Sequence, residues 1–211
     1  MSGSIETVIA GSVAARTTPN RSVMLPRLGP SLHAMLTAAG YERCRDPRYD
    51  WHGLKRGREP FVLLQYTLSG GGLLEFEGQP YPVPPGSAML LYFPHDNRYW
   101  LPKGGWWDFF YLCLNGSEIL KTWRTIIHEA GPVIPLPRSS AILRTAARIC
   151  RTILDDKLRS PWDASAKAYD LAMKLLEAFG PRNAADPASH DRPEPIKKAI
   201  EFCRQYLASP I

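Results

Sequence analysis

Apolar and polar residues alternate from Phe61 to Leu101 with a period of two, the spacing of a half-buried β-strand. The first run, FVLLQYTLSG, meets a triple glycine at 70–72, and glycines supply the positive φ angles that a hairpin turn needs. A second run, LLEFEG, leads through YPVPPG to another apolar segment, SAMLLYFP. Closely spaced short strands joined by tight turns predict a small β-barrel.

The β pattern extends from about Tyr49 to Pro137. Prolines cannot sit inside central strands, so the prolines between 82 and 102 mark strand ends. We therefore predict strands at 49–56, 61–69, 73–77, 79–83, 87–93, 97–101 and 106–114, with an edge strand at 132–136. One helix interrupts them at 117–130, where Ser117 is a capping residue and the apolar positions form a stripe.

From Ser139 onward the apolar spacing becomes helical. One helix has apolar positions at Ile142, Leu143, Ala146, Ile149, Cys150, Ile153 and Leu154. Pro161 suits the first turn of a second helix, which ends at Gly180. Its apolar face is Trp162, Tyr169, Met173, Leu176 and Phe179. The predicted fold class is mainly β with α, a β-barrel followed by an antiparallel helix pair.

The segments outside the barrel differ from it in composition. Residues 1–40 are rich in Ser, Thr, Gly, Arg and Pro, and we expect a flexible arm there with a short helix at 31–40. The barrel then spans 41–137 and the helix pair spans 138–180. Residues 181–193 form a Pro/Ala-rich linker, and 194–211 form one amphipathic helix that cannot bury its own face.

Composition and charge are those of an ordinary globular protein, with 45% hydrophobic and 22% charged residues and a formal charge of +6. The densest basic group, Arg43 to Arg58, also contains acidic residues, so we expect a mixed, solvated surface. We see no signal peptide and no apolar run of membrane-spanning length, and we expect a soluble, cytoplasmic chain with no membrane contact.

Catalytic and metal-binding motifs are missing from the sequence. The four cysteines are far apart, and His95 is the only histidine between His52 and His128, so we expect no metal and no cofactor. No nucleophile elbow, P-loop or dinucleotide fingerprint is present. Glu75 and Glu77 have the alternation of a solvated hairpin face. We therefore expect no catalytic residues and no enzyme activity.

Aromatic residues are dense between 97 and 114. Alternation along the last strand puts one set of residues on the same face: Trp107, Phe109, Tyr111 and Cys113. Asp108 is on the opposite face, which indicates that the opposite face looks outward and that the face with Trp107 lines the barrel. Aromatic walls with a few polar groups suit a small ligand such as a sugar. An ordinary aromatic core is the alternative interpretation.

The stretch from GYERCRDPRYDWHGLKRGREPF to FPHDNRYWLP resembles the N-terminal sensor domain of AraC-type transcription regulators. WWDFFYLCLNG, the helix after it and the helix pair continue the similarity over roughly 40–179, and EPIKKAIEFCRQYLASPI resembles the first helix of that family's DNA-binding domain. The resemblance implies a cupin-like (jelly-roll) barrel that binds an effector, arabinose in the best-known member.

By position, Arg56 is similar to the arginine that hydrogen-bonds the sugar in that family, and Tyr99 to the tyrosine after the turn. Phe109 and Tyr111 fall where the arabinose binder has a histidine and a tryptophan. Asn97 replaces another histidine, and these departures speak against arabinose itself. The candidate ligand-binding residues are Arg56, Tyr66, Tyr99, Trp107, Phe109 and Tyr111.

The resemblance also implies a homodimer through residues 142–179 and DNA binding through a helix-turn-helix domain that is absent beyond its first helix. The chain is then a fragment or a truncated regulator that dimerises with full-length partners. An alternative from another class is a stand-alone cupin-type metal-dependent isomerase or oxygenase.

Overall fold

The structure, a computed structural model, describes residues 20–23, 32–181, 194–195, 198 and 202. The chain divides into two compact units, Met1–Pro181 and Arg182–Ile211, and every strand and helix given below belongs to the first. The expected linker at 181–193, the terminal helix at 194–211 and most of the expected arm at 1–40 lie largely outside the described residues.

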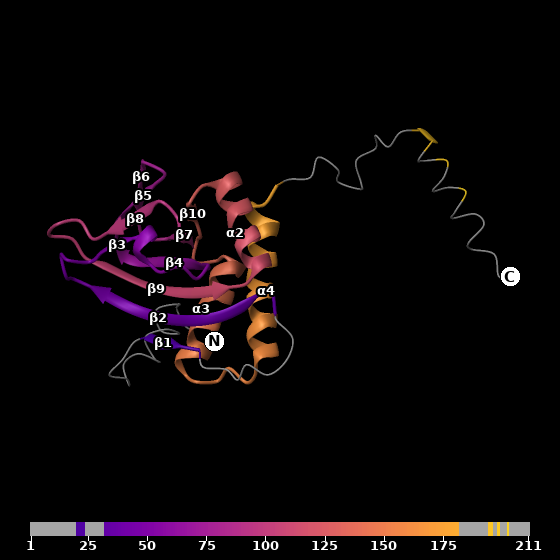
Figure 1. Cartoon of the computed structure of the whole chain (residues 1–211), viewed down its shortest axis with the longest axis horizontal. Coiled ribbons are helices and arrows are strands. Elements are labelled where there is room, and N and C mark those ends of the chain that lie inside the picture. The colour runs from indigo at the N-terminus through magenta and orange to yellow at the C-terminus, as the bar shows by residue number, and fades with distance from the viewer. Residues whose placement is uncertain (1–19, 24–31, 182–193, 196–197, 199–201, 203–211) are drawn as a thin grey trace. The chain divides into compact units, whose positions relative to one another are not determined.

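Two antiparallel sheets make up the barrel (Figure 1). The six-stranded sheet has the order β1 (Asn20–Ser22), β2 (Met35–Cys44), β9 (Trp107–Asn115), β4 (Phe61–Gly70), β7 (Ser87–Phe93) and β10 (Val133–Pro135). The four-stranded sheet has the order β3 (Asp50–His52), β8 (Asn97–Trp100), β5 (Gly72–Phe76) and β6 (Gln79–Val83). A 3-10 turn, η1 (Gly53–Lys55), follows β3. This is a cupin-like fold, as predicted.

Strand register decides which side chains face the barrel interior. Residues directly opposed on neighbouring antiparallel strands share a face. Thr67 opposes Phe109, and its Oγ1 donates to the Val83 carbonyl of the other sheet at 3.5 Å. Trp107 Nε1 donates to the same Oγ1 at 2.9 Å. The inner face of β9 is therefore the one that carries Trp107, Phe109, Tyr111 and Cys113, in agreement with the parity argument.

Three helices cover the outer face of the six-stranded sheet. The helix α2 (Ser117–Ala130) packs on β4 and β7, where Trp123 Nε1 donates to the Leu63 carbonyl at 3.1 Å. The helix α3 (Ala141–Leu154) packs on β1, β2 and β9. The helix α4 (Pro161–Phe179) packs on β2 and contacts both other helices. The outer face is thus a second, mainly apolar layer of the core.

Serine hydroxyls cap the two C-terminal helices. Ser140 Oγ accepts from the Ile142 amide of α3, and Ser160 Oγ accepts from the Asp163 amide of α4, each at 3.2 Å. These bonds satisfy N–H groups that have no partner inside the helix. Pro161 occupies the first turn of α4, as its fixed φ predicts.

The expected helix at 31–40 is wrong, because β2 begins at Met35 and runs to Cys44. An isolated helix of this length is marginal in water, whereas β2 forms a long ladder with β9 and a short one with β1. The small residues of TAAG also let rings and helices approach the strand closely. The expected strand at 49–56 is shorter than predicted, because it ends at His52 and continues as η1.

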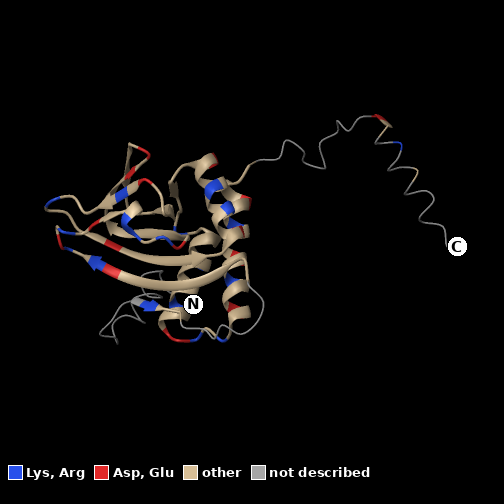
Figure 2. Ribbon diagram, in the orientation of Figure 1, with Lys and Arg blue, Asp and Glu red and all other residues tan. Residues whose placement is uncertain are grey.

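Charged residues of both signs are interspersed over the strands and helices of this unit (Figure 2). Arg45 pairs with Asp108 at 2.6 Å, Arg48 with Asp46 at 2.8 Å and Arg98 with Asp50 at 2.7 Å. The basic group is therefore partly neutralised, as expected for a mixed surface. Among the described residues, no helix is long and apolar enough to cross a membrane.

Candidate functional site

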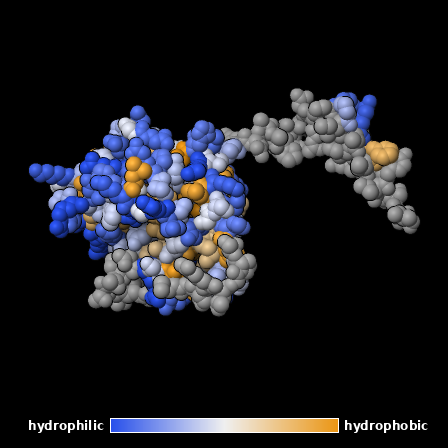
Figure 3. All heavy atoms as spheres, in the orientation of Figure 1, coloured by the Kyte–Doolittle hydropathy of each residue, from blue (hydrophilic) through white to orange (hydrophobic). Residues whose placement is uncertain are grey.

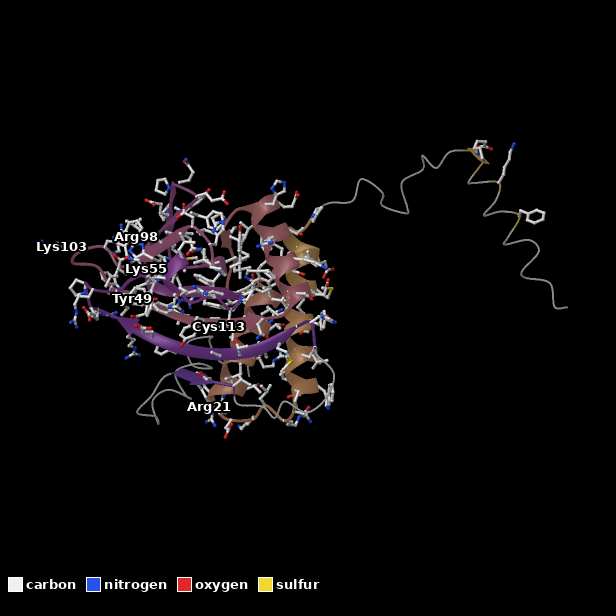
Figure 4. All side chains as sticks on the ribbon, in the orientation of Figure 1. Arg21, Tyr49, Lys55, Arg98, Lys103 and Cys113 are labelled. Atoms are coloured by element: carbon white, nitrogen blue, oxygen red, sulfur yellow. The ribbon has the colours of Figure 1, made fainter. Side chains whose placement is uncertain are left out.

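Aromatic rings from both sheets and one loop meet in the barrel interior. Tyr49, in the segment 45–49 between β2 and β3, has ring centroids 6.2 Å from Tyr99, 6.0 Å from Trp107 and 5.8 Å from Phe109. Figure 4 labels Tyr49 and also Cys113, which stands further along the inner face of β9. Tilted and edge-to-face contacts of this kind are a favoured arrangement of aromatic rings.

Arg56 ends η1 and brings a cation to this cluster. Its Cζ lies 4.3 Å from the ring centroid of Trp51, 5.8 Å from that of Phe61 and 5.7 Å from that of Phe93. The guanidinium forms no ion pair or hydrogen bond within the part of the chain that the structure describes. Its five donors are therefore held against aromatic faces and remain available to a ligand.

Glu42 brings a carboxylate to the same interior. It opposes Phe109 across β2 and β9 and so shares the inner face, and burial raises its pKa. Like Arg56, it has no hydrogen-bond partner among the described residues. The interior thus holds one donor-only cation and one acceptor-only anion that do not pair with each other.

The three inner phenols lie in the field of both charges. Burial raises the pKa of Tyr49, of Tyr99 and of Tyr111, the last to about 12, and the positive charge of Arg56 opposes this in each case. The negative charge of Glu42 raises all three further. The phenols are therefore neutral at physiological pH, and each can donate one hydrogen bond and accept others.

Cys113 is a wall residue of this interior. Burial raises the pKa of its thiol to about 11, and Arg56 opposes the shift. A protonated, buried thiol behaves as a small hydrophobe. Within the described residues, no three His, Cys, Asp or Glu side chains gather to hold a metal ion.

Two glycines make room for two of the inner rings. A Cβ on Gly40 would lie 2.5 Å from Cε1 of Tyr111, and a Cβ on Gly72 would lie 2.0 Å from Cζ3 of Trp107. Both approaches are closer than real Cβ contacts allow. Gly40 on the neighbouring strand β2 and Gly72 on β5 of the other sheet therefore let the rings of Tyr111 and Trp107 approach the backbone closely.

Five of the six predicted site residues lie at the barrel interior: Arg56, Tyr99, Trp107, Phe109 and Tyr111. Tyr66 does not join them, because it opposes Phe110 on the outer face of the sheet and the two ring centroids are 5.6 Å apart. Parity within FVLLQYTLSG separates Tyr66 from Gln65, and the register with β9 shows that the inner position is Gln65. We leave Tyr66 out of the candidate pocket.

Sequence reasoning missed Gln65, Glu42 and Tyr49. The only sequence signal for Gln65 is that it is a polar residue inside an apolar run. In the described structure its amide Nε2 is buried without a hydrogen-bond partner. Glu42 lies in a segment for which a strand was not expected. Tyr49 enters the interior from a loop, so strand periodicity does not identify it.

A surface cavity of about 540 Å³ adjoins the aromatic cluster. Glu42, Cys44, Tyr49 and Trp51 line it, together with charged residues of the segment 43–50. Glu42 and Tyr49 line this cavity and also belong to the interior, so the cavity borders the aromatic cluster, and we refer to it as the entrance cavity. The fold and this site together define a ligand-binding barrel domain.

The model of the AraC-like ligand binding domain matches residues 39–172, well over half of the 211 residues. The chain therefore belongs to the family of AraC-like ligand-binding domains, and the resemblance seen in the sequence is confirmed to this extent. That membership indicates the effector-binding part of a regulator rather than an enzyme.

Solved structures similar to the chain include regulators and cupin proteins. The AraC-like transcriptional activator CuxR is 13% identical, with 89% of this chain and 69% of that chain covered and a TM-score of 0.45. YhaK from Escherichia coli is 21% identical, with 55% and 50% covered and a TM-score of 0.37. A cupin 2 conserved barrel protein from Salinispora arenicola is 11% identical, with 50% and 82% covered and a TM-score of 0.33. The chain spans only half of the length of YhaK. No curated protein matches it.

Proposed function

We propose that this domain is the effector-sensing and dimerisation part of an AraC-type DNA-binding transcription regulator that acts in the cytoplasm. The observation that carries the proposal is the barrel interior, where Arg56 and Glu42 face aromatic rings without partners among the described residues. Both side chains are only partly buried beside the aromatic rings, so their charged groups remain open to a ligand. Unpaired donors and acceptors beside an entrance suit a ligand that is itself polar.

The effector in this proposal is a small, net-neutral, oxygen-rich molecule such as a sugar. The charges of Arg56 and Glu42 balance, which favours a neutral ligand over a strongly charged one. The hydroxyls of Tyr99 and Tyr111 add groups that both donate and accept, and the rings of Phe109 and Trp51 offer faces for C–H groups. Phe109 and Asn97 remain departures from the arabinose pattern.

Isothermal titration with L-arabinose and D-galactose tests the sugar assignment. A saturable heat for either sugar with the wild-type protein, lost in Arg56→Ala, is the expected result. No heat with any monosaccharide would remove sugars from the proposal.

The dimer contact is narrower than the expected 142–179. The apolar residues of α3 are buried against the barrel of their own chain, from Ile142 to Leu154. On α4, by contrast, Trp162, Tyr169 and Met173 are 52%, 36% and 49% exposed. Their spacing of seven and four residues places them on one helix face. We therefore assign the contact to α4 at 162–173.

Ligand binding has a short route to this helix layer. Gly40, which lies under Tyr111, also accepts a weak hydrogen bond from Cys150 Sγ of α3 at 3.8 Å. A ligand that moves Tyr111 would act on β2 and so on the helices that pack on it. Such coupling requires that the effector bind two states of the domain with different affinity. DNA contact in this proposal comes from a helix-turn-helix domain outside the described residues.

Sedimentation velocity with a matched tryptophan pair tests the dimer. Trp162→Glu is expected to shift a dimer toward monomer by at least tenfold in dissociation constant, because it puts a charge into the apolar contact. Trp106→Glu is the control, because Trp106 is 50% exposed on the loop before β9, away from α4. A wild-type protein that stays monomeric at high concentration would contradict the dimer.

A further inference from the structure

Gln65 is an exception among the buried polar groups of the central strand β4. It is 2% exposed and stands between Met89 of β7 and Tyr111 of β9, so strands flank it on both sides. Its Nε2 is fully covered and has no hydrogen-bond partner within the described structure. A buried amide donor without an acceptor is unfavourable, and an apolar side chain of similar size would avoid the cost.

The side chain of Gln65 belongs to the inner face. Tyr111, directly opposite, shares that face with Phe109 and Trp107, and Thr67, two residues further along β4, reaches the other sheet through the Val83 carbonyl. On the outer face of β4, Tyr66 contacts Phe110 of β9, and the helix α2 packs against this strand. Gln65 is thus directed between the sheets, toward the same space as Tyr111.

The other buried donors close to Gln65 on this sheet are satisfied, whereas the remaining buried atoms without a partner in the described residues, His95 Nδ1 and Asn97 Oδ1, lie at and after the turn that precedes β8. Thr67 Oγ1 both donates to the Val83 carbonyl and accepts from Trp107 Nε1. Trp123 Nε1, on the outer side, donates to the Leu63 carbonyl. Two residues before and two residues after Gln65, at Leu63 and Thr67, β4 therefore forms hydrogen bonds with the two tryptophan indoles.

We propose that Gln65 Nε2 donates a hydrogen bond to an oxygen of the effector and so selects effectors with an acceptor at the depth of Tyr111. This inference rests on the proposed function, since it assigns a further contact to the same pocket. With Arg56 at the end of η1, it gives the pocket two separate donor groups that await acceptors. The effector then carries at least two oxygens, one for each donor.

Access to Gln65 requires a side-chain movement, because its Nε2 is covered by the surrounding side chains. The ring of Tyr49 is carried by the segment before β3 and contacts Tyr99, Trp107 and Phe109. The Tyr49 carbonyl accepts from the Leu101 amide at 3.0 Å, so a movement here would involve the side chain and not the backbone. A displaced Tyr49 would leave space for a ligand between the entrance cavity and the inner face. The effector thus replaces part of the aromatic filling of the barrel.

The substitution Gln65→Leu tests the assignment, with Thr67→Val as a matched control on the same face. Without ligand, Gln65→Leu is expected to melt at the same temperature as the wild type or higher, because it removes an unsatisfied amide. Thr67→Val is expected to melt several degrees lower, because it leaves Trp107 Nε1 unpaired. A Gln65→Leu protein that melts as low as Thr67→Val would show that the amide has an internal partner and would overturn the inference.

Titration of the same proteins with L-arabinose and D-galactose separates this inference from the proposed function. If the wild type binds a sugar, Gln65→Leu is expected to bind it about tenfold more weakly or worse, as for a lost hydrogen bond in a dry site. Equal affinity would overturn the role of Gln65 and leave the effector domain standing. If the wild type binds neither sugar while Gln65→Leu is the more stable protein, the sugar assignment fails and the amide remains a donor for another oxygen ligand.

Discussion

The two faces of the six-stranded sheet are built from the same strands but differ in how their polar groups are paired. On the outer face, Phe110, Leu112 and Leu114 are fully buried under helices, and the indole N–H of Trp123 has a carbonyl partner. On the inner face, the neighbours of these residues are mixed with polar side chains. The Arg56 guanidinium, the Glu42 carboxylate and Gln65 Nε2 have no hydrogen-bond partner among the described residues. The outer face is organised for packing, whereas the inner face keeps binding capacity.

The surface of the unit also has two kinds of region, a mostly polar one and an exposed apolar stripe on α4. The face of the unit seen in Figure 3 is mostly hydrophilic, with a few apolar residues among the polar ones. The exposed large apolar side chains of the unit include the α4 stripe, Trp162, Tyr169 and Met173. Packing within one chain does not account for the open polar groups of the interior or for the exposed apolar residues of α4. In the proposed function, the effector binds the polar groups and a second copy of the chain covers the apolar residues.

The largest effect is expected on the outer face. Phe110→Ala removes a fully buried ring that packs on Tyr66, and we expect it to cost about 3–5 kcal/mol of unfolding free energy. Urea denaturation measures this loss. Phe110→Leu, which refills most of the volume, should lose about a third as much. If Phe110→Ala were nearly neutral, the outer face would not be the packed layer described above.

A smaller effect with a definite pH dependence is expected at Glu42. Burial raises the pKa of this carboxyl in the folded state, so its contribution to stability is fully present below the unfolded value of about 4.5 and is lost as the pH rises through the folded pKa. Glu42→Gln should therefore raise the melting temperature at pH 7 slightly, and the difference should vanish as the pH falls to 4.

Glu75→Gln is the control for that measurement, because Glu75 is exposed on β5 opposite Arg98. It should leave the melting temperature within about one degree of the wild type at both pH values, as for most exposed polar substitutions. A Glu42→Gln protein that is less stable than the wild type at pH 7 would mean that the carboxylate is paired in the folded state, and it would remove one of the unpaired inner groups.

The fold was largely predictable because hydrophobic periodicity is a local signal. The strands from 61 to 114 and the helices α2, α3 and α4 lie within a few residues of their predicted limits. The expected cap at Ser117 is wrong, because Gly116 is the N-cap of α2 and no side chain caps this helix. The strand β2 was not predicted, since TAAG has little alternation and its pairing partner, β9, is some seventy residues further along the chain. Long-range pairing decides its conformation.

The site was less predictable than the fold. Parity assigned Trp107, Phe109 and Tyr111 to one face of β9, and only the register with β4 shows that Gln65 shares this face and that Tyr66 does not. The residue Tyr49 reaches the interior from a loop, and Glu42 does so from the strand that was not predicted. Sequence reasoning therefore finds residues on regular elements with known faces, and it misses those that tertiary pairing brings in.

The central claim is that the barrel interior binds the effector, and one paired measurement tests it directly. The wild-type domain and Arg56→Ala are melted with the same library of small neutral and acidic metabolites, with Arg98→Ala as the control, because Arg98 is paired with Asp50 on the surface. We predict oxygen-rich compounds that raise the melting temperature of the wild type and of Arg98→Ala but not that of Arg56→Ala. Compounds that stabilise all three proteins equally, or a library with no stabilising compound at all, would contradict the claim.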